Sequence, residues 1–421
     1  MHWIYLSATV AVSATLVALT PICAAEPTQR GLERISIDDR LPYAQQPIDY
    51  RSRLSSDAVA HLSERIDAGS VRLRHDESQG YLLSLLSALE VPVESQLLVF
   101  SKTALHPRLV TPKNPRAVYF NDNVSVTWTP GASTLEIAAD DPRKGSLFYV
   151  VHQDPNRTPR PERTNRCLTC HVSESTLQIP GWMLRSYSTD ENGKPTSGYG
   201  HVTHATEIKK RWGGWYVTGN AGLQPQHRGN RFDGVGNRDH SHAIPDIVSD
   251  LSPFLDIARY PAADSDLVAH LVLDHQAQGK NLITRVAYEA RLNRHSDSEE
   301  QLVRYLLFAD EAPLTMRAGS RSGYAVWFER QGPFNQQGRS LRQFDLETRL
   351  FRYRLSYLIY SKVFDGLPPD AKQRLYDRLW QILTGRDQSP TFQHLDPDER
   401  AAIIKIVRAT KDDLPAVWSG H

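Results

Sequence analysis

Two cysteines and a histidine stand close together near the middle of the chain, in the string Cys167-Leu-Thr-Cys-His171. The spacing C-x-x-C-H is typical of the attachment site of a c-type haem. Two thiols three positions apart reach the two vinyl groups on one side of a porphyrin, while the adjacent imidazole reaches the iron. We therefore predict one covalent haem c, with thioether bonds to Cys167 and Cys170 and with His171 as the proximal iron ligand.

Three other interpretations of the same string are a redox dithiol, a structural disulfide and half of a zinc site. A zinc knuckle needs a second pair of ligands at similar spacing, and the chain contains no other C-x-x-C. A thioredoxin-like dithiol is expected beside a βαβ unit, whereas the residues that flank this string are polar and rich in turn formers. The pattern and its surroundings favour haem.

The N-terminal residues predict export. Residues 3–25 are apolar and uncharged, and small residues at Cys23 to Ala25 precede Glu26. Such a segment is typical of a secretory signal peptide, here residues 1–25, and it predicts a periplasmic address. The segment before the apolar run carries only His2, and the run is long enough to span a bilayer, so an uncleaved N-terminal membrane anchor is the alternative.

Export and haem attachment support each other. If cleavage follows Ala25, the two cysteines that are left both belong to the C-x-x-C-H string, so no separate disulfide framework is available in an oxidising compartment. Attachment of c-type haem takes place outside the cytoplasm, where the signal would send this chain.

Composition excludes some classes of partner. The 421 residues include 49 Lys and Arg against 48 Asp and Glu, a formal charge of +1. This balance argues against binding to nucleic acid or to an acidic membrane surface. No second apolar run of membrane-spanning length follows the first. Hydrophobic residues make up 40% of the chain, which is enough for a substantial core.

Hydrophobic periodicity predicts an α+β fold: an antiparallel β module that carries the haem site, followed by a helical C-terminal region. The expected strands are 97–101, 117–120, 124–128, 134–137, 147–152, 182–187 and 215–218. The expected helices are 55–67, 79–89, 247–260, 264–293, 344–362, 370–383 and 397–411. The predicted organisation is a signal (1–25), a linker (26–50), a helical lead-in (51–95), the β-rich haem module (96–243) and the helical region (244–421).

Four blocks of sequence resemble those of uncharacterised exported bacterial proteins that carry one C-x-x-C-H. The blocks are Pro115 to Asp122, Cys167 to His171, Arg211 to Gly219 and Gly338 to Arg342. The resemblance runs through most of the chain after the signal. It implies a c-type haem and an extracytoplasmic address, and it implies no activity.

The second axial ligand is the least determined part of the predicted site. Met183 lies twelve positions after His171, so it reaches the opposite haem face only if the chain wraps tightly round the porphyrin edge. His204 lies 33 positions after His171, in a glycine-rich loop beside Trp212 and Trp215. We therefore predict that His204 is the second iron ligand, which implies a low reduction potential. Ligation by Met183 and five-coordinate iron are the alternatives.

Other charged and histidine side chains have weaker claims. Five histidines lie in the glycine-rich segment 200–242 and are candidate ligands, metal sites or ordinary loop residues: His201, His204, His227, His240 and His242. Five arginines near the C-terminus are possible partners of haem propionates, although a solvated face with local ion pairs is the favoured interpretation: Arg339, Arg342, Arg349, Arg352 and Arg354.

Two functions from different classes follow, with a third interpretation behind them. The first is electron transfer to or from an unknown redox partner protein. The second is a haem-dependent redox enzyme, peroxidase- or oxidase-like, acting on a small-molecule substrate. The chain is several times larger than a simple electron shuttle needs, which keeps the second hypothesis open. In the third, the haem is a structural plug in a binding protein.

Overall fold

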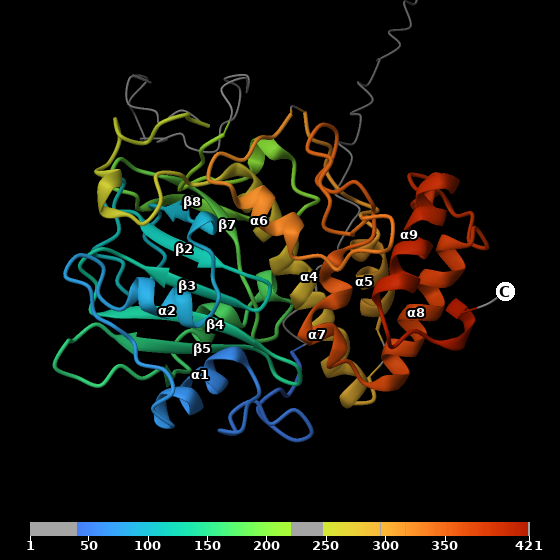
Figure 1. Cartoon of the computed structure of the whole chain (residues 1–421), viewed down its shortest axis with the longest axis horizontal. Helices are drawn as coiled ribbons and strands as arrows, with labels where there is room; N and C mark the ends of the chain where they lie inside the picture. The colour runs from blue at the N-terminus through green and yellow to red at the C-terminus, as the bar shows by residue number, and fades with distance from the viewer. Residues whose placement is uncertain (1–39, 220–246, 295, 316, 420–421) are drawn as a thin grey trace, which may run out of the picture. The chain divides into compact units, whose positions relative to one another are not determined.

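An antiparallel sheet organises the part of the chain that this computed structural model describes, namely residues 40–219, 247–294, 296–315 and 317–419. Its seven strands lie in the order β6-β5-β4-β3-β2-β1-β9, and a separate hairpin pairs β7 with β8 (Figure 1). The strands of the sheet are β1 (Leu97–Val99), β2 (Arg116–Phe120), β3 (Val124–Trp128), β4 (Thr134–Asp141), β5 (Gly145–His152), β6 (Glu162–Arg163) and β9 (Trp215–Tyr216). The hairpin consists of β7 (Arg185–Thr189) and β8 (Pro195–His201).

Short polar side chains close the turns between consecutive strands. Between β2 and β3, the Asn121 side-chain oxygen accepts hydrogen bonds from the backbone N–H groups of Asn123 and Val124. Between β4 and β5, Asp141 does the same for Arg143 and Lys144. These Asx turns fix the register of the hairpins.

The two faces of the sheet differ because successive side chains of a strand point to opposite sides. One face carries Ala117, Tyr119 and Val126, which join a core with residues of the N-terminal helices α1 (Ala58–Asp67) and α2 (Leu82–Ala88). The opposite face carries Val118 and Phe120, which belong to a second core. The sheet therefore separates two hydrophobic layers.

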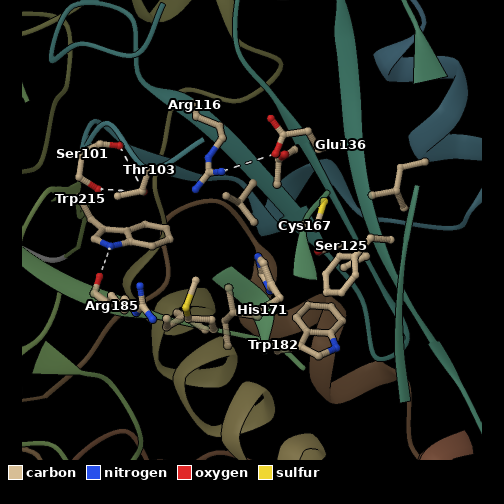
Figure 2. Close-up of a pocket in the computed structure, with 18 of the residues that line it drawn as sticks. Ser101, Thr103, Arg116, Ser125, Glu136, Cys167, His171, Trp182, Arg185 and Trp215 are labelled. Atoms are coloured by element: carbon tan, nitrogen blue, oxygen red, sulfur yellow. Dashed lines mark hydrogen bonds and ion pairs between the residues drawn. The ribbon is translucent and has the colours of Figure 1, made fainter. Parts of the chain in front are cut away.

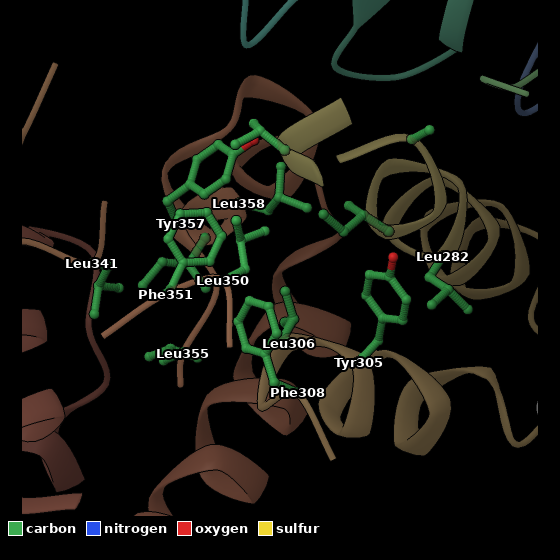
Figure 3. Packing of buried hydrophobic residues seen from close by; sticks show 14 of the residues in the cluster. Leu282, Tyr305, Leu306, Phe308, Leu341, Leu350, Phe351, Leu355, Tyr357 and Leu358 are labelled. Atoms are coloured by element: carbon green, nitrogen blue, oxygen red, sulfur yellow. The ribbon is translucent and has the colours of Figure 1, made fainter. Parts of the chain in front are cut away.

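The second core is built around a long buried helix, α4 (Leu267–Arg291). Asp266 caps its first turn by accepting hydrogen bonds from the N–H groups of Val268 and Ala269. Every residue from Leu267 to Glu289 is buried. Its apolar side chains pack with those of the C-terminal helical region, as Figure 3 shows for Leu282 beside Tyr305.

Polar side chains of α4 find partners in several surrounding elements. The Lys280 ammonium lies 2.6 Å from a carboxylate oxygen of Asp140 on β4, and both side chains are buried. The same ammonium lies 4.0 Å from the ring centroid of Trp182. On the other side, the Tyr357 hydroxyl donates a hydrogen bond to the Gln276 side chain. The helix is thus tied to the sheet and to the C-terminal region at once.

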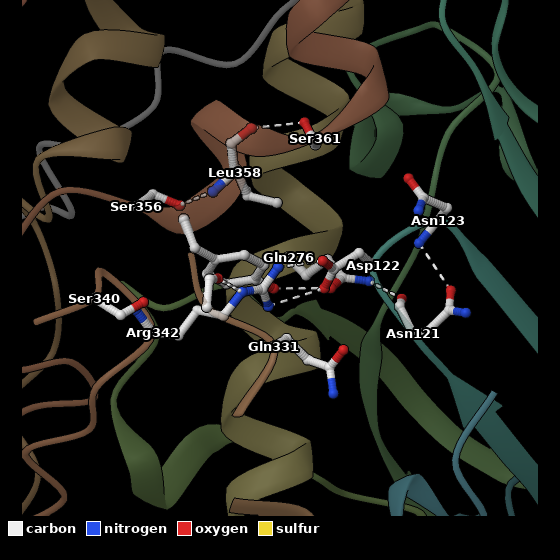
Figure 4. A network of polar contacts seen from close by, with 12 residues as sticks. Asn121, Asp122, Asn123, Gln276, Gln331, Ser340, Arg342, Ser356, Leu358 and Ser361 are labelled. Carbon is white, nitrogen blue, oxygen red and sulfur yellow. Dashed lines mark hydrogen bonds and ion pairs between the residues drawn. The ribbon is translucent and has the colours of Figure 1, made fainter. Parts of the chain in front are cut away.

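One of the C-terminal arginines contradicts the expectation of a solvated face. Arg342 is buried, and its guanidinium forms an ion pair with Asp122, in the turn between β2 and β3 (Figure 4). Its guanidinium carbon also lies 4.5 Å from the ring centroid of Tyr357. Arg342 therefore joins the helical region to the sheet, which a sequence-local reading cannot reveal because 220 positions separate the two partners.

Besides α1, α2 and α4, the described α-helices are α3 (Leu168–His171), α5 (Ser298–Leu306), α6 (Tyr324–Arg330), α7 (Lys362–Asp365), α8 (Pro369–Leu383) and α9 (Pro397–Thr410). Most of the elements predicted from the sequence are confirmed, but two of the predicted helices are wrong. Residues 247–260 form turns and the short 3-10 helix Ile257–Arg259 instead of an α-helix. The Asp250 side chain accepts a hydrogen bond from the Ser252 backbone there, a local bond that competes with helix formation. Residues 344–361 form bends and the short 3-10 helix Tyr357–Tyr360.

The linker expectation also needs a correction where the structure describes it. Residues 41–50 form turns, and Leu41, Ile48 and Tyr50 are buried against the sheet core.

Among the described residues, no helix combines the length and the apolar character that crossing a membrane requires.

The Lys280–Asp140 pair predicts an asymmetric stability effect. Replacing Lys280 by Met leaves the Asp140 carboxylate buried without its counter-charge, so we expect a loss of about 3–5 kcal/mol in the free energy of unfolding. Lys372→Met removes a partner from the more exposed pair with Asp413, and we expect a loss of about 1 kcal/mol or less. Urea denaturation measures both, and equal losses would contradict the interpretation.

Candidate functional site

The cysteine motif forms a short helix directly after β6. Cys167 precedes the first residue of α3, and Cys170 and His171 end it. Residues three and four positions apart share one face of a helix, and Cys167 and His171 both line the cavity described below, whereas Cys170 is not among its lining residues. Both cysteines are free thiols, Cys167 half-buried and Cys170 exposed, and no disulfide joins them. A ligand bonded at both sulfurs would therefore extend from the cavity to the surface.

Beside this helix lies a cavity of about 140 Å³, part of it open to solvent. Its walls come from the sheet face that bears Val118, from the motif, from residues 182–187 and from the tryptophan of β9. Figure 2 shows His171 and Arg116 pointing into this space. The residues that the chemistry below uses are Arg116, Thr127, Glu136, Phe148, Cys167, His171, Trp182, Met183, Arg185, Tyr187 and Trp215.

The His171 ring is held in one tautomer. Its Nδ1 lies 2.8 Å from the carbonyl oxygen of Gly181, and because a carbonyl only accepts, Nδ1 carries the proton and Nε2 keeps a bare lone pair. Burial lowers the pKa of His171 to about 4, so the ring is neutral near pH 7. A neutral imidazole whose other nitrogen donates to a carbonyl is the form in which histidine binds metals.

The carbonyl that orients His171 is itself held by α4. The Asn281 side chain accepts a hydrogen bond from the Trp182 N–H at 2.9 Å and donates one to the Trp182 carbonyl at 2.8 Å. The indole N–H of Trp182 donates to Asp140 on β4. A Cβ at Gly181 would lie 2.3 Å from the Asn281 oxygen, so the close approach of this loop to the helix requires glycine.

The ionisation of Cys167 argues against a reactive dithiol. Burial raises the pKa of this thiol to about 11, whereas redox-active cysteines have pKa values below that of a free thiol. Cys167 is therefore protonated near neutral pH and is a poor nucleophile for disulfide exchange.

The structure does not bring His204 to this cavity. His204 is buried elsewhere, with its Nδ1 2.8 Å from Nδ1 of His275 on α4 and its ring stacked on Tyr305 at a centroid distance of 3.8 Å. It is not a lining residue, whereas Met183 is. The pairing partner lies 71 positions away, which is why the loop sequence around His204 concealed a core position.

The other histidines do not form a metal centre among the residues that the structure describes, since those residues contain no group of three or more His, Cys, Asp and Glu suited to a metal ion. His201 ends β8 and is half-buried. His227, His240 and His242 lie outside the described residues. Trp212 and Tyr216 are core residues, and Trp215 is both buried and part of the cavity wall.

Sequence reasoning missed the polar side chains that the sheet contributes to the cavity. Arg116, Thr127 and Glu136 alternate with apolar residues along β2, β3 and β4, and such alternation normally indicates a solvent face. The only available signal was that these strands precede the cysteine motif in sequence.

Comparisons with protein-family models, with curated proteins and with solved structures find no match to this chain.

The contact between Gly181 and Asn281 yields a stability prediction. Gly181→Ala forces the loop or Asn281 to move and weakens the two hydrogen bonds to Trp182, so we expect a loss of about 1–3 kcal/mol in the free energy of unfolding. The matched control is Gly200→Ala, because a Cβ there meets nothing within 4 Å, and we expect a change within about 0.5 kcal/mol. Chemical denaturation distinguishes the two, and a harmless Gly181→Ala would contradict this packing.

Proposed function

We propose that this chain is an exported single-haem c-type protein whose first function is electron transfer. Cys167 and Cys170 would hold the haem through thioether bonds, and His171 would bind the iron through Nε2. The observation that carries the proposal is the hydrogen bond from Nδ1 of His171 to the Gly181 carbonyl, in a cavity that Cys167 also lines. Haem, when bound, supplies one-electron redox chemistry.

The chain's own residues have separate tasks in this proposal. His171 keeps its proton at Nδ1, because the Gly181 carbonyl accepts it, and so presents a lone pair at Nε2. The Phe148 ring lies 4.6 Å from the imidazole ring, centroid to centroid, and limits its rotation. Trp182 and Trp215 are buried cavity walls that exclude water, which affects the reduction potential.

Electron transfer to a partner protein also requires an edge of the proposed haem to lie near the protein surface. Cys170 is exposed, so a group bonded at its sulfur has an edge near solvent, where a redox partner protein can dock. The proposed periplasmic address rests on the apolar residues 3–25 and on the resemblance to exported proteins, because the structure does not describe residues 1–39.

The second candidate function is a haem-dependent redox enzyme. A specific observation favours it: the sheet contributes Arg116, Thr127 and Glu136 to the cavity, and an electron shuttle has no need of buried polar groups there. The sixth iron ligand decides between the candidates, because chemistry at iron requires an open position. His204 was the expected ligand, and its place in the core beside His275 supplies no support for that role.

Covalent attachment is tested by replacing the cysteines. The double variant Cys167→Ala, Cys170→Ala should lose all haem on extraction with acidified acetone, whereas wild type should retain it, because only thioether bonds resist extraction. His171→Ala should keep covalent haem and show an altered iron spectrum, since attachment and axial ligation are separate bonds. His106→Ala, which changes a half-buried histidine bonded to Thr134, should alter neither. Extraction-resistant haem in the double cysteine variant would overturn the proposal.

A further inference from the structure

Three neighbouring polar side chains on the cavity face of the sheet form a group, here called the sheet floor: Arg116, Thr127 and Glu136. Thr127 is the cross-strand neighbour of both Val118 and Glu136, and Arg116 lies two positions before Val118 on the same face of β2. Farther along β2 this face is apolar and buried, at Phe120. The floor is therefore a local polar site within a face that otherwise packs against the core.

Two atoms of the sheet floor are buried without a hydrogen-bond partner. They are the Nε of Arg116 and the hydroxyl oxygen of Thr127. The Arg116 side chain is only 15% exposed, and its nearest carboxylate oxygen, on Glu136, lies 3.8 Å away, beyond hydrogen-bond distance. A buried guanidinium with an unmet donor is costly unless a partner completes it, and both residues line the cavity.

Met183 lies on the same side of the site as His171. The Gly181 carbonyl accepts from Nδ1, so Gly181 is on the side of the imidazole that faces away from a metal at Nε2. Met183 follows two residues later, and two extended residues span at most about 7 Å. Its sulfur would have to pass round the edge of the macrocycle to reach the opposite haem face, and so short a backbone tether disfavours that path.

The remaining residues that line the cavity include no other histidine or methionine within the part of the chain that the structure describes. Arg185 is already engaged, by the hydroxyls of Ser173, Ser175 and Tyr187. Among the residues that line the cavity, the group best suited to a ligand is the sheet floor, with a cationic donor in Arg116 and a hydroxyl in Thr127.

We infer that the sheet floor binds a small anion coordinated to the iron on the haem face opposite His171. The ligand class is a small oxygen or nitrogen anion, of the kind that azide and hydroperoxide represent. Arg116 would donate to the anion and Thr127 would complete its hydrogen bonds, in place of the distant Glu136 carboxylate. This inference rests on the proposed haem, and it identifies the substrate class of the second candidate function.

The test uses the purified, haem-loaded, oxidised protein, with sodium azide and neutral imidazole titrated separately and followed by absorption. Wild type should bind both. Arg116→Leu should weaken azide binding about ten-fold or more, the usual effect of losing a charge-assisted hydrogen bond, and should leave imidazole binding within about three-fold. Arg116→Lys should recover part of the azide affinity because it restores the positive charge.

A second variant, for which the opposite effect is expected, tests the inference even if Arg116→Leu fails to fold. Glu136→Gln removes the carboxylate that competes for the guanidinium and repels anions, so azide should bind several-fold more tightly. Fluoride, a second anion, should follow the same order among the variants.

Three results would overturn the inference. A protein with covalent haem whose spectrum neither ligand shifts has its sixth position filled by the chain. If Arg116→Leu leaves the azide affinity unchanged but shifts the reduction potential, the Arg116 guanidinium contacts a haem propionate and not the anion. Wild type without extraction-resistant haem removes the proposed function as well, and extraction with acidified acetone separates this failure from the first two.

Discussion

The structure depends on burying a helix that is rich in polar side chains. Between Leu267 and Glu289, α4 has no exposed residue, so each polar group on it requires a partner from a neighbouring element. Lys280 pairs with Asp140 of the sheet, Gln276 bonds to the Tyr357 hydroxyl of the C-terminal region, and Asn281 bonds to the loop after the cysteine motif. An apolar helix would permit sliding between layers, whereas these directional contacts define one register for the sheet, the loop and the helical region together.

A short series of hydrogen bonds connects α4 to the candidate site. Asn281 brackets the backbone of Trp182, the preceding Gly181 presents its carbonyl to His171, and the imidazole is thereby held in the tautomer that leaves Nε2 bare. The small residue at 181 permits the close approach. The orientation of His171 is therefore controlled by a buried helix about a hundred positions later in sequence, and packing alone holds the ring in a tautomer that is able to bind a metal.

The cavity has two chemically different sides. The cysteine motif and Trp182 present a histidine, sulfur and aromatic rings, whereas the sheet presents Arg116 and Glu136. A site built only for electron transfer would be served by an apolar second side, since desolvation and axial ligation already control a reduction potential. The polar second side instead resembles a place that a small charged molecule completes, which is the physical reason for giving catalysis weight beside electron transfer.

The sequence by itself determined the local features: the C-x-x-C-H string, the strand alternation from 97 to 152, and the long helix that the structure places at Leu267–Arg291. Each depends on spacing within a few residues, and hydrophobic periodicity reports such spacing directly. Only the tertiary structure decided that Arg116 borders a cavity, that Arg342 is buried against Asp122, and that His204 belongs to the core with His275. A polar residue in a strand or loop has the same sequence signature whether water or a distant side chain satisfies it, and only the fold supplies that partner.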